Sequence, residues 1–177
     1  GTGNYNDATA KLYTDMGLLT CNPSIGEDAT AVFNMLSGYS EPLSWNKLSL
    51  APLWLKDRFL YLSEREMMHA KAGEKGHIIA KVNSLCDKDI IAALYEAAEA
   101  GVKIDLIVRG ICCLKAGVAG ETDNIRIISI VGRFLEHSRI YIFGKDDPKV
   151  YIASADFMTR NTVHRVEVAA PVYDPAI

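Results

Sequence analysis

The spacing of apolar and polar residues along this 177-residue chain predicts an ordered series of helices and strands. Apolar residues at helical intervals indicate a short helix over Asp28–Leu36 and a longer helix from Pro52 to about Ala72. Pro52 suits a first helical turn, and Gly73 stands where that helix should end. A connector rich in turn-forming residues, Gly38–Trp45, joins the two predicted helices.

From residue 78 onward the pattern is that of a strand–helix–strand unit followed by further strands. The strand Ile78–Val82 precedes a helix over Asp87–Ala100 that Gly101 would close, and Val102–Val108 follows as a second strand. A crossover of this length implies parallel pairing and a right-handed connection. Four more strands are predicted at Ile125–Ile130, Arg139–Phe143, Val150–Ala153 and Val166–Val172. We therefore expect an α/β fold with a mixed, largely parallel sheet flanked by helices.

The composition fits one full domain, or one domain plus a piece of another, because 49% of the residues are apolar. The first residues, Gly1–Asn6, lack Met and are not expected as a native start, so we interpret the chain as a fragment. We expect residues 1–47 to be the C-terminal tail of one domain and residues 48–177 to form a second, similar domain.

The net charge of −3 conceals a difference between the two parts of the chain. Residues 1–100 hold nine Lys and Arg against thirteen Asp and Glu, whereas residues 101–177 hold ten against nine. Six of these ten cations are arginines, whose planar forks match phosphate oxygens: Arg109, Arg126, Arg133, Arg139, Arg160 and Arg165. The four cysteines lack the spacing of a zinc site, which favours a reducing cytoplasm. No apolar run is long enough to span a bilayer, so we expect no transmembrane segment.

One group of polar side chains borders two neighbouring predicted strands. His137 precedes the first of them, and Ser154 and Asp156 follow the second. If the two strands form a hairpin, these side chains meet at one edge with the guanidinium of Arg139, and Arg160 follows closely. Such a set could supply a phosphoryl centre with a nucleophile or proton donor, a charge clamp and orienting hydrogen bonds. The alternative is that His137 is a surface histidine at the start of a strand.

Four further features of the sequence bear on a functional site. Arg109 follows a predicted strand at a place where α/β folds often hold ligands, which favours a site. For Tyr13 the residues alone favour a half-buried strand residue rather than a site. The motif His69-Ala70-Lys71 lies near the end of the long helix, and we interpret His69 as a helix-end histidine favoured by the helix dipole. The GTGNYN segment lacks the context of a dinucleotide fingerprint, and no Walker A motif is present.

The pattern His137-x-Arg139, followed by Ser154-x-Asp156 and Asn161, resembles the HxK…SxN half-site of the phospholipase D superfamily. In that superfamily two half-sites face each other across one active centre. Longer segments are similar to the bacterial polyphosphate kinases, and the similarity covers essentially the whole chain. These segments are GTGNYNDATAKLYTD at 1–15, VKIDLIVRGICCL at 102–114, SIVGRFLEHSRIYIFG at 129–144 and ASADFMTRN at 153–161.

The resemblance implies roles for individual residues. Gly1-Thr2-Gly3-Asn4 corresponds to the SxN end of the first half-site, so the autophosphorylated histidine of the family lies upstream of Gly1. Tyr13 matches a tyrosine that contacts nucleotide, and Arg109 matches an arginine that contacts phosphates. His137 matches the second active-site histidine, which the resemblance assigns to proton transfer or phosphate binding.

Arg139 and Arg160 are weaker candidates for phosphate clamps, because neither rests on a specific match to the family. The chain departs from the family pattern at Phe157, Thr159 and His164, which flank the expected site and carry no assigned chemistry.

For the intact enzyme, the resemblance implies reversible transfer of the terminal phosphate of ATP to inorganic polyphosphate through a phosphohistidine. Mg²⁺ is the expected cofactor, with no metal ligand in this chain. We expect ATP or ADP and polyphosphate as partners, a homo-oligomer when full-length, no nucleic acid, and an inactive isolated fragment. The expected location is the cytoplasm, with peripheral membrane association as an alternative. Two other functions stay open: a phosphodiesterase or nuclease of the wider superfamily, against which Arg139 in place of lysine argues, and a non-catalytic polyanion-binding module.

Overall fold

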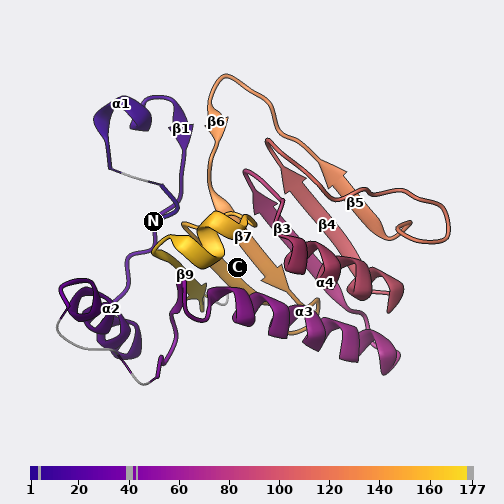
Figure 1. Ribbon diagram of the computed structural model, residues 1–177, viewed down its shortest axis with the longest axis horizontal. Coiled ribbons are helices and arrows are strands. Elements are labelled where there is room, and N and C mark those ends of the chain that lie inside the picture. Colours follow the sequence, from indigo (N-terminus) through magenta and orange to yellow (C-terminus); the bar gives the residue numbers. More distant parts are fainter. Residues whose placement is uncertain (4, 39–41, 43, 175–177) are drawn as a thin grey trace.

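The computed structural model describes residues 1–3, 5–38, 42 and 44–174. Within that part of the chain, seven strands form a central sheet in the order β2-β9-β8-β7-β3-β4-β5 (Figure 1). In chain order these strands are β2 (Ser49–Ala51), β3 (His77–Val82), β4 (Lys103–Val108), β5 (Ile125–Ile128), β7 (Arg139–Phe143), β8 (Lys149–Ala153) and β9 (Glu167–Val172). The four strands predicted after residue 120 are all present, and their ends agree with the predicted ends to within about two residues.

The sheet is mixed, which confirms the α/β class, but the balance of its pairings differs from the expectation. β4 pairs in parallel with β3 and β5, whereas the other four neighbouring pairs among the described residues are antiparallel. The parallel half follows from the long crossover through α4 (Lys88–Glu99), and the tight turn between β7 and β8 permits only antiparallel pairing. The expected largely parallel sheet is therefore corrected to one parallel and one antiparallel half.

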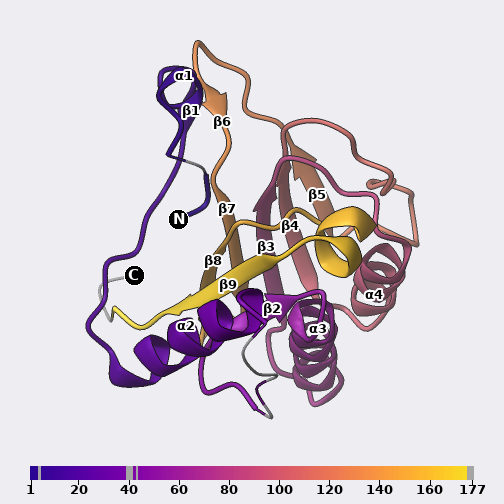
Figure 2. The same ribbon diagram turned by 60° about the vertical axis from the view of Figure 1, so that its left-hand side comes forward.

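Two long helices cover one face of this sheet. α3 (Leu55–Lys71) and α4 lie side by side there, as Figures 1 and 2 both show. Beneath them lies a core with an aromatic centre, in which Phe59 packs against other rings. The centroid of the Phe59 ring lies 4.5, 6.2 and 5.5 Å from those of Tyr141, Phe143 and Phe157. This core fixes the strands whose ends carry the polar side chains described below.

The predicted strand–helix–strand unit is confirmed together with its helix caps. The Asp87 carboxylate accepts hydrogen bonds from two N–H groups in the first turn of α4, and Gly101 follows the helix with φ of 91°. Only glycine adopts that backbone conformation without steric strain. β3 and β4 on either side of the helix pair in parallel, as the length of the crossover implied.

The starts of the other two predicted helices need correction. α3 begins at Leu55 because Pro52 lies in a preceding turn, which the hydrogen bond from the Trp54 N–H to the Leu50 carbonyl closes. α2 spans Pro23–Leu36 and therefore begins five residues before Asp28. The side chain of Asn22 caps it by accepting hydrogen bonds from the N–H groups of Ser24 and Ile25.

A small two-stranded sheet stands apart from the main one (Figures 1 and 2). After the short helix α1 (Asp7–Ala10), β1 (Tyr13–Thr14) pairs in parallel with β6 (Leu135–Glu136). Strands of two residues leave no periodic pattern in a sequence, so this pairing was not predicted. Its consequence is that residues 13–15 lie next to residues 135–137.

α2 is tied to the segment before β2 by one buried carboxylate. Asp28 is 2% exposed and accepts hydrogen bonds from the backbone N–H groups of Asn46, Lys47 and Leu48 at 2.9, 2.6 and 2.8 Å. Burial alone would raise the pKa of Asp28, but these hydrogen bonds outweigh it and hold the pKa below its ordinary value of 3.8. A carboxylate with a lowered folded pKa stabilises the protein above pH 3.8, and this contribution is lost as the pH falls through the folded value.

We predict that Asp28→Ala lowers the free energy of unfolding by about 2–3 kcal/mol at neutral pH, because three backbone donors lose a charged acceptor. The difference from wild type should shrink in acid below pH 3.8. Urea denaturation at several pH values measures both effects. The exposed neighbour Glu27 provides the control, since Glu27→Gln should change stability by less than about 0.5 kcal/mol. Equal, small effects of both substitutions would contradict the structural role of Asp28.

Candidate functional site

A polar cavity of about 480 Å³ lies at one edge of the central sheet. β3, β4 and β8 end at this edge, while β7 and β9 begin there, because each is antiparallel to its ending neighbour. Polar residues that follow or precede these strand ends therefore converge. The cavity is lined by Thr2, Gly3, Asn83, Ser84, Arg109, His137, Arg139, Ser154, Asp156, Arg160, Asn161, Arg165 and Glu167. Four of the five predicted site residues are in this set, and the fifth, Tyr13, lies against His137.

His137 lies between β6 and β7 and is held by the N-terminal segment. Its Nδ1 lies 2.9 Å from Oδ1 of Asp15, and the ring of Tyr13 stacks on the imidazole with centroids 4.7 Å apart. Thr2 donates a further hydrogen bond of 2.8 Å to the Asp15 carboxylate. A carboxylate only accepts, so the contact with Asp15 puts the proton on Nδ1 and leaves Nε2 as the ring nitrogen for chemistry. Nη1 of Arg139 also lies 3.2 Å from Nδ1, and a hydrogen bond there would instead need Nδ1 as the acceptor. The pairing of β1 with β6 brings both partners to His137.

Arg139 is buried and its donors are already engaged. Its Nε and Nη2 donate to the two oxygens of Asp156 at 3.2 and 3.0 Å, and its Nη1 donates to the carbonyl of Thr2 at 2.6 Å. Arg139 is 7% exposed and Asp156 is 6% exposed, so the pair is a buried, bidentate ion pair. Arg139 lines the cavity, but much of its hydrogen-bonding capacity stabilises the strand ends. Its predicted role in phosphate binding stays a prediction.

The other arginines of the cavity are less constrained. Arg109 follows β4 and is half-buried, and its Nε donates to Oδ1 of Asn83 at 2.8 Å. Arg160 begins the π-helical turn η1 (Arg160–His164), and Arg165 follows it; both are exposed. Arg160 and Arg165 have no hydrogen bond or ion pair to the described residues. The Arg139 charge is balanced by Asp156, so Arg109, Arg160 and Arg165 supply the positive charge available to an anion.

A buried acceptor group forms another part of the cavity wall. Glu167 accepts hydrogen bonds from the Ser154 hydroxyl and, at 2.6 Å, from Nδ2 of Asn161. The Oδ1 atom of Asn161 is buried and has no hydrogen-bond partner among the described residues. The polar groups of this wall therefore bind one another, apart from that single buried acceptor.

Several residues in or next to the cavity were not singled out from the sequence as parts of the site. Asp15 lies inside the KLYTD segment and Asn83 directly follows a predicted strand, so both had a local signal. Glu167 and the placement of Arg165 had none, because strand periodicity does not show which polar residue turns into a cavity. Asn4, the last residue of the predicted SxN segment, lies outside the described residues.

The residues set aside during sequence analysis lie elsewhere. His69 is on the last turn of α3 and pairs with Glu74, as expected for a helix-end histidine. Phe157 belongs to the aromatic core rather than to the cavity. Cys112 and Cys113 are exposed, free cysteines outside the cavity lining.

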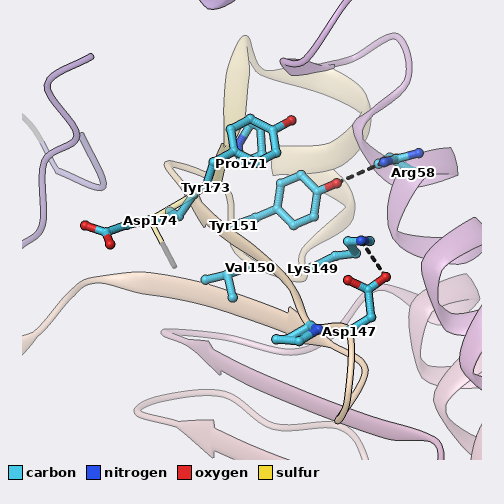
Figure 3. Close-up of a pocket in the computed structure, with 10 residues that line it drawn as sticks. Arg58, Asp147, Lys149, Val150, Tyr151, Pro171, Tyr173 and Asp174 are labelled. Carbon is cyan, nitrogen blue, oxygen red and sulfur yellow. Dashed lines mark hydrogen bonds and ion pairs between the residues drawn. The ribbon is translucent and has the colours of Figure 1, made fainter. Parts of the chain in front are cut away.

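A second cavity, of about 530 Å³, lies at the opposite end of β8 and β9 (Figure 3). The hydroxyl of Tyr151 there accepts a hydrogen bond of 3.0 Å from Nη2 of Arg58, and Lys149 pairs with Asp147 at 2.7 Å. It contains none of the predicted site residues and no histidine. We therefore place the candidate site in the first cavity, where the imidazole and the arginines meet.

Among the described residues, no group of three or more His, Cys, Asp and Glu side chains is arranged to hold a metal ion. The expectation of Mg²⁺ for the intact enzyme stays a prediction. Within the same part of the chain, no helix is long and apolar enough to cross a membrane.

The fold and the cavity define a phospholipase D-like α/β protein. The crystal structure of Nuc from Salmonella typhimurium, a phospholipase D family member, matches 72% of this chain and 81% of its own chain. The TM-score is 0.51 at 17% sequence identity, a likeness of fold.

The chain belongs to the polyphosphate kinase family. The family model for polyphosphate kinase C-terminal domain 2 matches residues 48–177, and the model for C-terminal domain 1 matches residues 1–42. The chain is 59% identical over 175 residues to a polyphosphate kinase of Halalkalibacterium halodurans, covering 98% of this chain and 25% of that protein. It is 53% identical to one of Thermosynechococcus vestitus, covering 100% of this chain and 24% of that protein.

A solved structure extends this similarity to three dimensions. The crystal structure of polyphosphate kinase from Porphyromonas gingivalis matches 99% of this chain and 27% of its own, with a TM-score of 0.94 and 44% identity. The chain spans about a quarter of the length of the curated relatives it matches.

The buried pair in the cavity wall generates a prediction about stability. Arg139→Met should lower the free energy of unfolding by about 3–5 kcal/mol, because it leaves the buried Asp156 carboxylate without its charged partner. Arg160→Met is the matched control: this arginine lines the same cavity but is exposed, and its loss should change stability by less than about 0.5 kcal/mol. Chemical denaturation of both variants measures the difference. A loss below about 1 kcal/mol for Arg139→Met would show that the pair does not hold the strand ends.

Proposed function

We propose that this chain forms the C-terminal part of an enzyme that reversibly transfers the terminal phosphate of ATP to inorganic polyphosphate. The observation that carries the proposal is the meeting of His137 with Arg109, Arg160 and Arg165 in one cavity of a chain from the polyphosphate kinase family. The names of the curated relatives, which are polyphosphate kinases, support the same reaction.

The proposed reaction runs in two steps through a carrier histidine. An imidazole nitrogen of the carrier attacks the terminal phosphorus of ATP, the bond to the bridging oxygen breaks, and ADP leaves. The terminal oxygen of polyphosphate then attacks the phosphohistidine, which frees the imidazole and lengthens the chain by one phosphate. We propose that the carrier lies upstream of Gly1, as the resemblance implies, and we therefore expect this chain alone to be inactive.

His137 is suited to assist these steps rather than to carry the phosphoryl group. Asp15 holds Nδ1, so Nε2 can donate a hydrogen bond to a phosphate oxygen when the ring is charged, or accept a proton when it is neutral. Tyr13 covers one face of the imidazole and limits its rotation. We keep Tyr13 as a nucleotide contact and His137 as a proton-transfer or phosphate-binding residue.

The arginines supply the charge that a phosphoryl transfer needs. Negative charge spreads over the equatorial oxygens of the transferring group, and preorganised donors stabilise it without reorganising at that moment. Arg109 presents a planar fork from the end of a strand, and Arg160 adds a second cation from η1. Bound Mg²⁺ would offset further phosphate charge in the intact enzyme.

One rival function is favoured by a specific observation, the fold shared with a phospholipase D family member. A phosphodiesterase or nuclease of that superfamily would use a lysine where this chain has Arg139, and the guanidinium is committed to Asp156. A non-catalytic polyanion-binding module would need the arginines but not His137. As further proposals we keep a cytoplasmic homo-oligomer, with peripheral membrane association as an alternative, and no nucleic-acid substrate.

In the full-length enzyme, His137→Ala should abolish polyphosphate synthesis, whereas His69→Ala should leave it nearly unchanged. The first residue lies in the cavity beside the arginines, and the second lies at the exposed end of α3. The measurement is formation of acid-insoluble polyphosphate from ATP by wild type and both variants. No product from the wild type would refute the proposed reaction, and comparable losses in both variants would show that the site has been misplaced.

We also predict that Arg109→Ala reduces transition-state stabilisation by about 2–4 kcal/mol, by analogy with other preorganised donors. Arg109→Lys should remain impaired, because lysine keeps the charge but loses the planar fork. Steady-state kinetics of the full-length variants give these losses, and a thermal melt should show an intact fold. Near-normal kinetics combined with a lowered melting temperature would instead identify Arg109 as a structural residue.

A further inference from the structure

We infer that Asn83 is a positioning residue, which sets the direction of the Arg109 guanidinium and ties it to the backbone of His137. The inference rests on the proposed function, because it gives Asn83 a part in the same phosphate-binding cavity. Asn83 is not assumed to touch the phosphates itself, and its effect passes through Arg109.

The position of Asn83 in the sheet explains why it can reach both partners. It is the first residue after β3, which lies between β4 and β7. Arg109 is the first residue after β4, which is parallel to β3. His137 lies just before β7, which is antiparallel to β3. Both residues therefore lie at the same edge of the sheet as Asn83. The side chain is 5% exposed, lines the cavity and is therefore largely shielded from competing water.

Every polar atom of the Asn83 side chain has a partner in the site. Its Oδ1 accepts a hydrogen bond of 2.8 Å from Nε of Arg109. Its Nδ2 donates to the carbonyl of His137 at 3.2 Å and to Oδ1 of Asp156 at 3.3 Å. These partners fix the amide orientation, because a flipped amide would turn its NH₂ group toward the Arg109 donor and its oxygen toward two acceptors.

The contact with Nε leaves the useful end of Arg109 available. Among the described residues, Nη1 and Nη2 of Arg109 have no hydrogen-bond partner, so the fork that could bind two phosphate oxygens is not consumed. An arginine side chain has many rotamers, and a bond at Nε removes much of that freedom before a ligand binds. A donor aligned in advance binds more tightly than one that must be ordered on binding.

Asn83 is itself anchored through its backbone. Its N–H donates to Oδ1 of Asp156 at 2.6 Å, and its carbonyl accepts a hydrogen bond of 2.7 Å from the N–H of Gly110. A Cβ atom at Gly110 would lie 3.0 Å from that carbonyl oxygen, so the close approach favours glycine. The backbone after β3 is therefore hydrogen-bonded to the backbone after β4. This contact limits the relative movement of Asn83 and Arg109, whose side chains are bonded to each other.

A double-mutant cycle in the full-length enzyme tests the inference, with Asn83→Leu, Arg109→Ala and the combination. The probe is inorganic tripolyphosphate, whose dissociation constant is measured by calorimetry alongside kcat/KM for polyphosphate synthesis. Asn83→Leu should weaken tripolyphosphate binding about tenfold when Arg109 is present, but less than about twofold in the Arg109→Ala background. A merely structural role would give the same factor in both backgrounds, and that result would overturn the inference.

Asn124→Ala is the matched control. Asn124 lies just before β5, at the edge of the sheet opposite the cavity. Its side-chain amide donates hydrogen bonds to the carbonyls of Ala98 and Val102. Its loss should lower the melting temperature and leave tripolyphosphate binding within about twofold of wild type. If Asn83→Leu does not fold, Asn83→Ala takes its place in the cycle, since it removes the same contacts without adding an apolar group.

The binding measurement separates failure of the inference from failure of the proposed function. Non-additive losses of tripolyphosphate affinity in an enzyme that makes no polyphosphate would refute the reaction and support the role of Asn83. Additive losses in an enzyme that does make polyphosphate would refute the role of Asn83 alone. A wild-type enzyme that neither binds tripolyphosphate nor makes polyphosphate would overturn both.

Discussion

The buried ion pair between Arg139 and Asp156 is the interaction on which the geometry of the cavity depends. Arg139 opens β7 and Asp156 follows β8, and the antiparallel register sets Arg139 opposite Ala153. The same carboxylate accepts the N–H of Asn83, so the ends of three strands are joined at one group. Burying two charges is favourable only when their geometry and hydrogen bonds are good, and the bidentate contact meets that condition.

This pair also determines which charges the site can use. Because Asp156 neutralises Arg139, the field of the cavity comes from the more accessible guanidinium groups of Arg109, Arg160 and Arg165. A buried, paired arginine and more accessible arginines therefore lie side by side in one cavity. An enrichment in arginine does not say which arginines are paired with carboxylates and which are accessible. That assignment requires the three-dimensional positions of the carboxylates.

Much of the fold was predictable because its signals are local. The cap at Asp87 and the glycine at 101 are encoded within a few residues, and both were confirmed. The hairpin of β7 and β8 then placed His137 and Asp156 together without further information. The contacts of Asp15 and Tyr13 with His137 could not be predicted. They depend on the pairing of β1 with β6, and strands of two residues leave no pattern in the sequence. The hydrogen bonds from Arg139 to Asp156 could not be predicted either, since a sequence does not show which acidic side chain is buried beside a given arginine.

The contact between Asp15 and His137 has a consequence for the order in which the molecule assembles. It joins residues 122 positions apart, whereas α3, α4 and the β7–β8 hairpin form from near neighbours along the chain. Local elements form early. The entropy cost of closing a long loop is offset only when the surfaces that the loop joins have already formed. We therefore expect the imidazole to be locked in place after the sheet that supports it. If residues 13–15 were not packed against residues 135–137, the molecule would keep its core but His137 would not be oriented. Activity at this centre would therefore indicate that the two segments have come together.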